Sequence, residues 1–182
     1  MLSTSKKLSW RDVKQQANKL EQTTLLALLG DLYELSEDNR TFVLARLGIG
    51  EDPLAPYKAV IDRWVCPNVQ RNQDISVKQA KNALSQYKKA VGDAQGIAEL
   101  ALYYCEACAD FLSFCGVEDE AYFVAIVSVV EQALNALVEL DEEGQQALLE
   151  RLYILWSQST DWGWGVSEDI ISLMDEHGID LE

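Results

Sequence analysis

The stretch IAELALYYCEACADFLSFCGVEDEAYFVAIVSVVEQALNALVEL, residues 97–140, is the most apolar part of the chain. In its first half, apolar side chains recur at steps of three and four residues, which is the period of one α-helix face. These side chains are Ile97, Leu100, Ala101, Tyr104, Cys108, Phe111, Leu112 and Cys115. Only a narrow strip of the segment is polar, and it comprises Glu99, Tyr103, Glu106, Asp110 and Ser113. The pattern predicts a buried central helix, with Leu112 in the middle of its buried face.

A second helix is expected directly after the first. Gly116 can end the first helix, because glycine adopts positive φ at little cost. Glu118, Asp119 and Glu120 then place negative charge at the positive end of the next helix, so the two helices form a hairpin. The alternative is a strand over residues 121–130, AYFVAIVSVV, which are rich in β-branched side chains. We favour the helix because the apolar pattern continues at helical spacing beyond this run.

Amphipathic helices are expected on both sides of this hairpin. Ser9, Ser36 and Ser76 each precede a pattern of helical period, which is where N-cap residues stand. About nine helices result in all. We therefore predict an all-α fold, either a multi-helix bundle or a degenerate helical-repeat stack around the central hairpin.

One polar segment interrupts these patterns. Residues 66–75, CPNVQRNQDI, contain a proline and several amide side chains and have no period, which favours a linker. We accordingly expect an N-terminal helical subdomain (1–66), a linker (67–75) and a C-terminal acidic helical subdomain (76–182). A single continuous domain is the alternative, because 182 residues fall within the usual size of one domain.

The net charge of −15 is distributed unevenly. Up to Lys89 the chain has 14 Lys and Arg against 10 Asp and Glu, whereas beyond it Arg151 stands alone against 20 acids. Such asymmetry bears on solubility, electrostatic steering and partner choice rather than on fold. It predicts a C-terminal half that attracts basic surfaces, and the overall charge of −15 disfavours direct nucleic-acid binding through Lys78, Lys81, Lys88 and Lys89.

We expect a cytoplasmic protein. The four cysteines lie among apolar residues rather than in loops, which favours reduced thiols over a disulfide framework. No uncharged apolar run approaches the roughly 18 residues of a membrane span, and the N-terminus MLSTSKKLSW lacks the apolar segment of a signal peptide. The sequence thus predicts a protein that is neither secreted nor inserted in a membrane.

Three clusters of residues carry a resemblance to a known family. The first comprises Leu32, Tyr33, Asn39, Arg40, Phe42, Arg46 and Leu47, the second is the run AKNALSQYKKAVGDAQGIAELALYY (80–104), and the third is Gly163-Trp164-Gly165. Together they resemble a family of small, all-helical bacterial proteins classed as a domain of unknown function, and the likeness covers most of the chain. The resemblance implies an all-helical fold and brings no activity, cofactor or catalytic residue with it. The cysteine-rich segment 105–115 departs from the family's pattern.

Signals for catalysis or metal binding are weak. Cys105 and Cys108 form a C-x-x-C, which supplies at most two of the four ligands of a zinc site. The single histidine, His177, lies near the C-terminus in the sequence DEHG and outside any catalytic-triad pattern. The sequence contains no nucleophile elbow, phosphate-binding loop or dinucleotide-binding fingerprint. We therefore expect a non-enzymatic protein with no catalytic, cofactor-binding or metal site.

Two features are candidates for partner binding. The segment DWGWG sets two tryptophans among glycines, and tryptophan is enriched at binding hot spots as well as at packed ends of bundles. The acid clusters 118–120 and 141–143 are exposed candidates, although the dipole of a following helix also favours acids there. The candidate partner-binding residues are Trp162, Trp164, Glu118, Asp119, Glu120, Asp141, Glu142 and Glu143.

The sequence favours a protein interaction module whose acidic surface binds a basic protein partner. The alternative is a nucleic-acid mimic, in which carboxylates imitate a phosphate array and inhibit a DNA- or RNA-binding protein. A mimic needs acids in regular rows on one face, whereas these acids come singly or at helix starts. Neither hypothesis includes a cofactor, direct nucleic-acid binding or a membrane.

Overall fold

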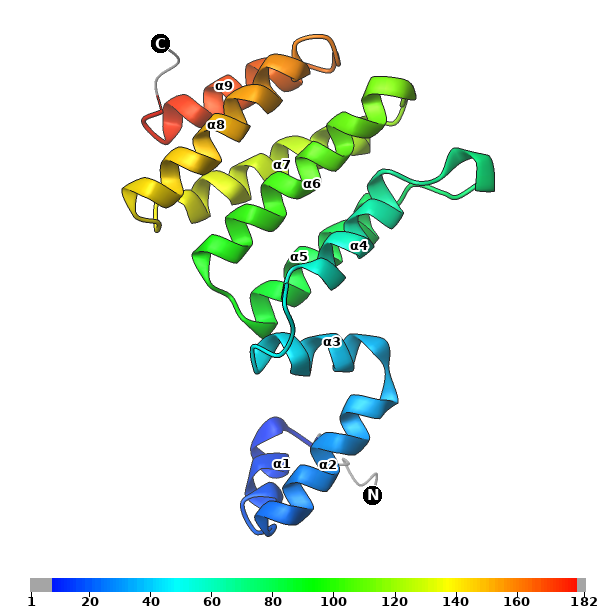
Figure 1. Cartoon of the computed structure of the whole chain (residues 1–182), viewed down its shortest axis with the longest axis vertical. Coiled ribbons are helices and arrows are strands. Elements are labelled where there is room, and N and C mark those ends of the chain that lie inside the picture. The colour runs from blue at the N-terminus through cyan, green and yellow to red at the C-terminus, as the bar shows by residue number, and fades with distance from the viewer. Residues whose placement is uncertain (1–7, 180–182) are drawn as a thin grey trace, which may run out of the picture. The chain divides into compact units, whose positions relative to one another are not determined.

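The computed structural model describes residues 8–179, and this part of the chain is helical throughout (Figure 1). It contains nine α-helices, one turn of 3-10 helix and no strand, so the all-α prediction is confirmed. The elements are α1 (Trp10–Ala17), α2 (Gln22–Leu35), α3 (Glu37–Arg46), α4 (Ala55–Val65), η1 (Val69–Arg71), α5 (Val77–Ala90), α6 (Ala94–Phe114), α7 (Glu120–Leu137), α8 (Glu142–Ser159) and α9 (Val166–Glu176).

The chain divides into two compact units, Met1–Val43 and Leu44–Glu182. The division therefore falls before α4 and not in residues 67–75, because α4 packs against α5 and α6 within the second unit. The N–H of Ser76 donates to the carbonyl of Trp64 (2.9 Å), and the Tyr122 hydroxyl donates to the carbonyl of Val65 (2.8 Å). Residues 67–75 are thus a turn that connects two helices, α4 and α5, of the same core. Their polar, aperiodic sequence suits a hairpin turn as well as a linker.

The first unit contains α1, α2 and most of α3. The expected caps are present: the Asp12 carboxylate accepts from the N–H of Ser9 (2.9 Å), and the Ser36 hydroxyl accepts from the N–H of Asn39 (3.1 Å). The Asn39 side chain also donates to the carbonyl of Leu32 (2.8 Å), which ties the α2–α3 junction together. Neither α1 nor α2 contains a buried residue, so this unit has no core of its own.

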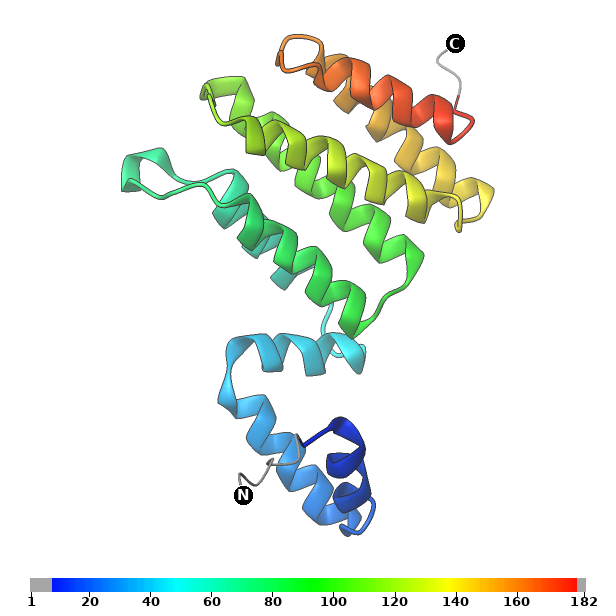
Figure 2. The same cartoon turned by 180° about the vertical axis from the view of Figure 1, so that it is seen from behind.

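The second unit is a stack of three helical hairpins, α4–α5, α6–α7 and α8–α9. Helices α4, α6 and α8 form one layer, seen in front in Figure 1, and α5, α7 and α9 form the other, seen in front in Figure 2. All the main helix contacts join helices that are neighbours or next-but-one along the chain. This arrangement matches the expected degenerate helical-repeat stack around a central hairpin.

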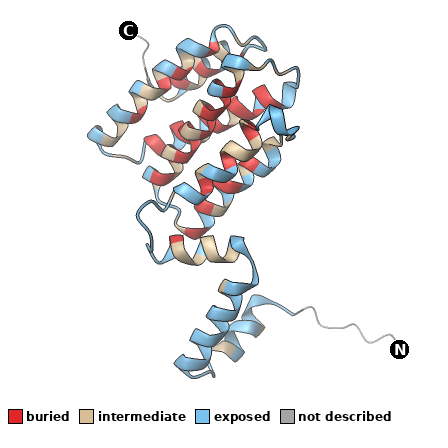
Figure 3. Cartoon of the chain, turned by 45° about the vertical axis from the view of Figure 1, so that its right-hand side comes forward, coloured by how far each residue is buried: buried red, intermediate tan, exposed pale blue. Residues whose placement is uncertain are grey.

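The core is centred on α6 and α7, which make the most extensive contact in the unit (Figure 3). Leu100, Tyr104 and Cys108 of α6 are fully buried, as are Ile126 and Leu134 of α7. The central hairpin is confirmed, and residues 121–130 are helical rather than a strand. Of their β-branched side chains, Ile126, Val129 and Val130 are fully buried, whereas Val124 is 58% exposed.

The prediction for Leu112 is wrong. Leu112 is only partly buried, whereas Phe111 is 2% exposed and fills the core in the same turn. Helix α6 contacts α4, α5, α7 and α8, so more than one face of it is covered. A single stripe of spacing three and four could not indicate which of two adjacent apolar residues points inward.

Helix α7 is the one helix, among the described residues, that is long and apolar enough to cross a membrane. Ten of its 18 residues are buried inside the second unit, and a buried core helix passes the same test of length and hydropathy.

A candidate interaction surface

The turns of the three hairpins lie at the same end of the second unit (Figures 1 and 2). They are residues 66–76 between α4 and α5, 115–119 between α6 and α7, and 160–165 between α8 and α9. Because each hairpin reverses the chain once and stacks on the next, every such turn returns to this end. We call it the hairpin end.

A chain of five aromatic rings runs through the hairpin end. Phe114 contacts Phe111 edge-on with ring centroids 5.4 Å apart, and Phe111 lies 6.4 Å from Tyr122. Tyr122 contacts Phe123 at 5.9 Å, and Phe123 stacks on Trp164 at 5.8 Å. The three middle rings are buried, while the terminal rings Phe114 and Trp164 are 63% and 55% exposed. Two large aromatic side chains are therefore presented to solvent on a rigid support.

A groove of about 460 Å³ opens beside Phe111, one of the three buried rings. This volume is within the range of about 300–1,000 Å³ usual for ligand pockets. The groove lies between the α4–α5 turn and the α6–α7 turn. Its apolar lining includes Val69, Ile75 and Val117, and the carboxylates of Glu118 and Asp119 also border it. The groove combines an apolar floor with a negative edge.

The loop that carries Trp164 has an unusual backbone. Gly163, Trp164 and Gly165 have φ values of 75°, 58° and 72°, all in the left-handed region. A bulky residue rarely adopts that conformation, and where it does so the surroundings hold it in place. Stacking on Phe123 supplies such a restraint and fixes the direction of the indole ring.

The structure brings some of the predicted partner-binding residues together and separates others. Trp164, Glu118, Asp119 and Glu120 lie at or beside the hairpin end, where Asp119 also caps α7 by accepting from the N–H of Ala121 (3.0 Å). Glu120 is the first residue of that helix, one turn before the ring of Phe123.

The other four predicted residues lie elsewhere. The side chain of Trp162 is partly buried and packs against the core, so it plugs the bundle. Asp141, Glu142 and Glu143 are at the opposite end of the second unit, where Asp141 caps α8 through the N–H of Gly144 (3.0 Å).

Sequence reasoning missed the apolar half of this surface. Val69 and Ile75 lie in the segment interpreted as a linker, and Phe114 ends a helix whose apolar residues were all assigned to the core. The helix ends at Phe114, and Cys115 follows in an extended conformation, so Gly116 does not supply the positive φ expected of it.

No family model, curated protein or solved structure matches the chain. The expected membership of a bacterial family of unknown function therefore stays a prediction from the quoted residues. We infer what the surface binds from its own side chains.

The one cation of the C-terminal half is occupied by internal contacts. The Arg151 guanidinium donates from Nε and Nη2 to the two oxygens of Glu106 (2.7 and 2.8 Å), and from Nη1 to Glu99. Glu99 is also paired with Lys58 (3.4 Å). The hydrogen bonds from Arg151 to Glu106 and Glu99 raise the pKa of Arg151 above its usual value. These contacts tie α4, α6 and α8 together, and the polar strip predicted on α6 meets polar neighbours.

All the described acids after Asp110 are exposed to solvent. They are Glu118, Asp119, Glu120, Glu131, Glu139, Asp141, Glu142, Glu143, Glu150, Asp161, Glu168, Asp169, Asp175 and Glu176. In the part of the chain that the structure describes, none of them forms an ion pair. The surface of α7, α8 and α9 is therefore strongly negative and uncompensated.

The cysteines and the histidine have structural surroundings. Cys105 and Cys108 are fully buried, and burial raises the pKa of both thiols. Within residues 8–179, no three histidine, cysteine or carboxylate side chains are grouped closely enough to hold a metal ion. His177 contacts the carbonyl of Leu173 through Nδ1 (2.8 Å) and the side chain of Asn135 through Nε2 (3.2 Å), which connects α9 to α7.

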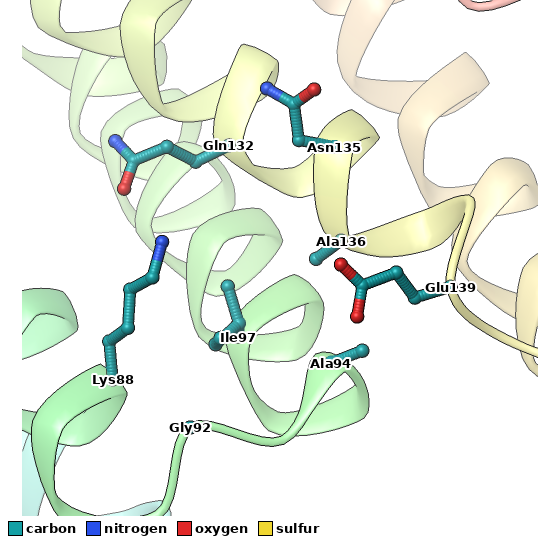
Figure 4. A pocket seen from close by; sticks show the side chains of 8 residues that line it. All are labelled: Lys88, Gly92, Ala94, Ile97, Gln132, Asn135, Ala136 and Glu139. Atoms are coloured by element: carbon teal, nitrogen blue, oxygen red, sulfur yellow. The ribbon is translucent and has the colours of Figure 1, made fainter.

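A second pocket lies at the opposite end, between the α5–α6 connection and the last turns of α7 (Figure 4). Lys88 and Glu139 extend over opposite sides of it, and Ile97 and Ala136 form its floor. Its volume of about 230 Å³ is below the range of about 300–1,000 Å³ usual for ligand sites. We therefore assign no ligand to this pocket.

Proposed function

We propose that this chain is a non-enzymatic protein interaction module whose hairpin end binds a basic segment of a partner protein. The observation that carries the proposal is that two exposed aromatic side chains, Phe114 and Trp164, share the hairpin end with an apolar groove that Glu118 and Asp119 border. A segment that alternates basic and large apolar side chains complements such a surface in both charge and shape.

The aromatic and acidic residues have different roles in this proposal. The acids of α7, α8 and α9 attract the basic partner over distances comparable to the Debye length of about 8 Å at physiological ionic strength, and so raise the association rate. Trp164 and Phe114 lose exposed apolar area on binding, which slows dissociation.

The nucleic-acid mimic remains the second hypothesis. It requires carboxylates in rows that follow a phosphate backbone, with a negative charge about every 1.7 Å of duplex axis. Asp93, Asp119 and Asp141 instead cap helices by accepting backbone N–H groups. The helix termini already account for three of the acids, so we rank the mimic below the interaction module.

A peptide-display selection against the intact chain tests the proposal. We expect the selected peptides to combine Lys or Arg with aromatic or branched apolar residues. Trp164→Ala should weaken their binding about tenfold or more, mainly through faster dissociation. The double reversal Glu118→Lys and Glu120→Lys should slow association and reduce its dependence on salt.

The matched control is Glu142→Lys with Glu143→Lys, which makes the same change of charge at the opposite end. This control should lower affinity only by weakening the long-range electrostatic attraction. Its effect should therefore disappear at high salt, which screens that attraction. Equal losses from both double reversals, with none from Trp164→Ala, would place binding outside the hairpin end. Competition of selected ligands with duplex DNA for a DNA-binding protein would favour the mimic.

A further inference from the structure

Helices α1 and α2 of the first unit expose many large apolar side chains. Six leucines of α2 are between 38% and 75% exposed, namely Leu25, Leu26, Leu28, Leu29, Leu32 and Leu35. On α1, Trp10 is 73% exposed and Val13 is 52% exposed. Contiguous apolar patches of this kind mark contact sites.

The leucines of α2 have the spacing of a coiled-coil seam. Leu25, Leu28, Leu32 and Leu35 follow one another at steps of three, four and three residues, which are the a and d positions of two heptads. A helix with such a seam packs against another helix along its whole length. Helix α1, with eight residues, is too short to cover the 14 residues of α2.

A groove of about 550 Å³ runs between α1 and α2 on the same hairpin. Its apolar lining includes Leu8, Val13, Ala17, Leu20 and Leu28. The groove thus offers an apolar surface to a row of leucine side chains, and α2 itself has such a row.

The charges of the hairpin are complementary to those of a second, antiparallel copy. Residues 8–20 contain Arg11, Lys14 and Lys19 against Asp12, whereas residues 21–35 contain Glu21, Asp31 and Glu34 and neither Lys nor Arg. Glu34 is paired with Arg40 of α3 (3.2 Å), so Glu21 and Asp31 carry the uncompensated negative charge of this part of the hairpin. The first helix is thus basic and the second acidic. In a two-fold arrangement, α1 of each copy meets α2 of the other, so opposite charges face each other twice.

The distribution of net charge also favours the α1–α2 hairpin over the second unit as a contact between two copies. Residues 1–43 contain six Lys and Arg and six Asp and Glu, so the whole net charge of −15 belongs to residues 44–182. A contact through the second unit would bring two strongly negative surfaces together.

We propose that a second copy of this chain covers the leucine face of α2, and that the two α1–α2 hairpins form an antiparallel four-helix bundle. The interface is isologous, with each leucine seam placed against the groove of the other copy. The chain is therefore a homodimer that carries two hairpin ends, one on each second unit.

Analytical ultracentrifugation of the full chain tests the proposal. We expect a mass twice the 20.4 kDa of one chain at concentrations of about 10–100 μM. Leu25→Glu with Leu32→Glu should weaken self-association at least tenfold. The matched control, Val138→Glu with Ile154→Glu, adds the same charge at exposed apolar sites of the second unit and should leave the dimer intact. Circular dichroism checks that every variant stays helical.

A charge-exchange experiment tests the pairing of α1 with α2. Arg11→Glu with Lys14→Glu makes both helices of one protein acidic, and Asp31→Lys with Glu34→Lys makes both helices of another basic. Each protein alone should be monomeric, and their mixture should form a heterodimer. A monomeric wild type would overturn the proposal, whether the leucine face is covered by the second unit of the same chain or by a different protein. A dimer that survives the leucine substitutions would also overturn it.

Discussion

Tyr87, Asp93 and Gly96 show how closely single residues fix the junction of α5 and α6. The Tyr87 hydroxyl donates to one oxygen of Asp93 (2.6 Å), and the other oxygen accepts from the N–H of Gly96 (2.8 Å). A Cβ atom on residue 96 would lie 1.9 Å from the Tyr87 hydroxyl oxygen. Glycine is therefore required within a helix, where it is otherwise unfavourable.

Gly96→Ala should lower the free energy of unfolding by about 1–3 kcal/mol, because the buried Tyr87 ring must move to accommodate the new methyl group. The matched control is Gly30→Ala in α2, where no atom lies within 4 Å of the added Cβ. That change should be neutral or stabilise the helix by up to about 1 kcal/mol. Urea unfolding of both variants measures the difference, and an equal effect at the two positions would contradict the close contact.

Arg151 is the residue on which the contact between α6 and α8 most depends electrostatically. Replacing it with methionine leaves the partly buried Glu106 without a cation and Glu99 with Lys58 alone, so the free energy of unfolding should fall by about 1–3 kcal/mol. Arg151→Lys keeps the charge but loses the two-pronged contact with Glu106, and should lie between wild type and the methionine variant. Thermal unfolding checks the order, which would be contradicted if lysine and methionine were equally damaging.

Helix α6 is covered by other helices on most of its circumference. Leu102 is 1% exposed, so Leu102→Ala should cost about 2–5 kcal/mol of unfolding free energy. Leu112→Ala should lower the free energy of unfolding clearly less. Leu112 is only partly buried, so water can fill part of the space that its side chain leaves. Chemical denaturation of the two variants gives the comparison. Equal losses would show that the last turn of α6 is packed as tightly as its centre.

Elements were more predictable from the sequence than their surroundings. The predicted caps Ser36 and Ser76 accept backbone N–H groups as expected, because a cap is a local property of a few residues. Whether the α2 leucines are buried or exposed is not a local property of the sequence. Their period predicts an amphipathic helix whether the apolar face meets a core of the same chain or another molecule, and in the structure it is exposed.

The candidate surface was predictable only in part for the same reason. Trp164 and residues 118–120 stood out by composition. The stacking of three hairpins brings together turns that are about 45 residues apart along the chain, so Glu118 and Asp119 border the same groove as Val69 and Ile75, and Trp164 stacks on Phe123. The separation of residues 141–143 has the same origin, since they begin a helix at the other end of the stack.

At the scale of the whole molecule, buried tyrosines make stability depend on alkaline pH. Burial, together with the hydrogen bond to Asp62, raises the pKa of Tyr103 to about 12, and burial also raises the pKa of Tyr57, Tyr87, Tyr104 and Tyr122. The folded state thus favours the protonated phenols. Their contribution is fully present below the unfolded pKa of 10 and is lost as pH rises towards 12.

Urea midpoints should therefore fall between pH 10 and pH 12, together with the appearance of tyrosinate absorbance. Tyr103→Phe removes one of the titrating groups, so the fall should be shallower in this variant, although its stability at neutral pH is reduced by the loss of the bond to Asp62 (2.8 Å). Identical slopes for the two proteins would show that Tyr103 ionises without cost in the folded state.

In the second unit, the main contacts join only helices that are near neighbours along the chain, and this arrangement bears on how fast the unit folds. Each hairpin closes a short loop before it meets the next, so little chain entropy is lost in any single step. Topologies of this kind have low contact order and fold quickly. Because α6–α7 offers both its flanks to neighbours, it is the natural nucleus onto which α4–α5 and α8–α9 add, and the outer hairpins should exchange their amide hydrogens first.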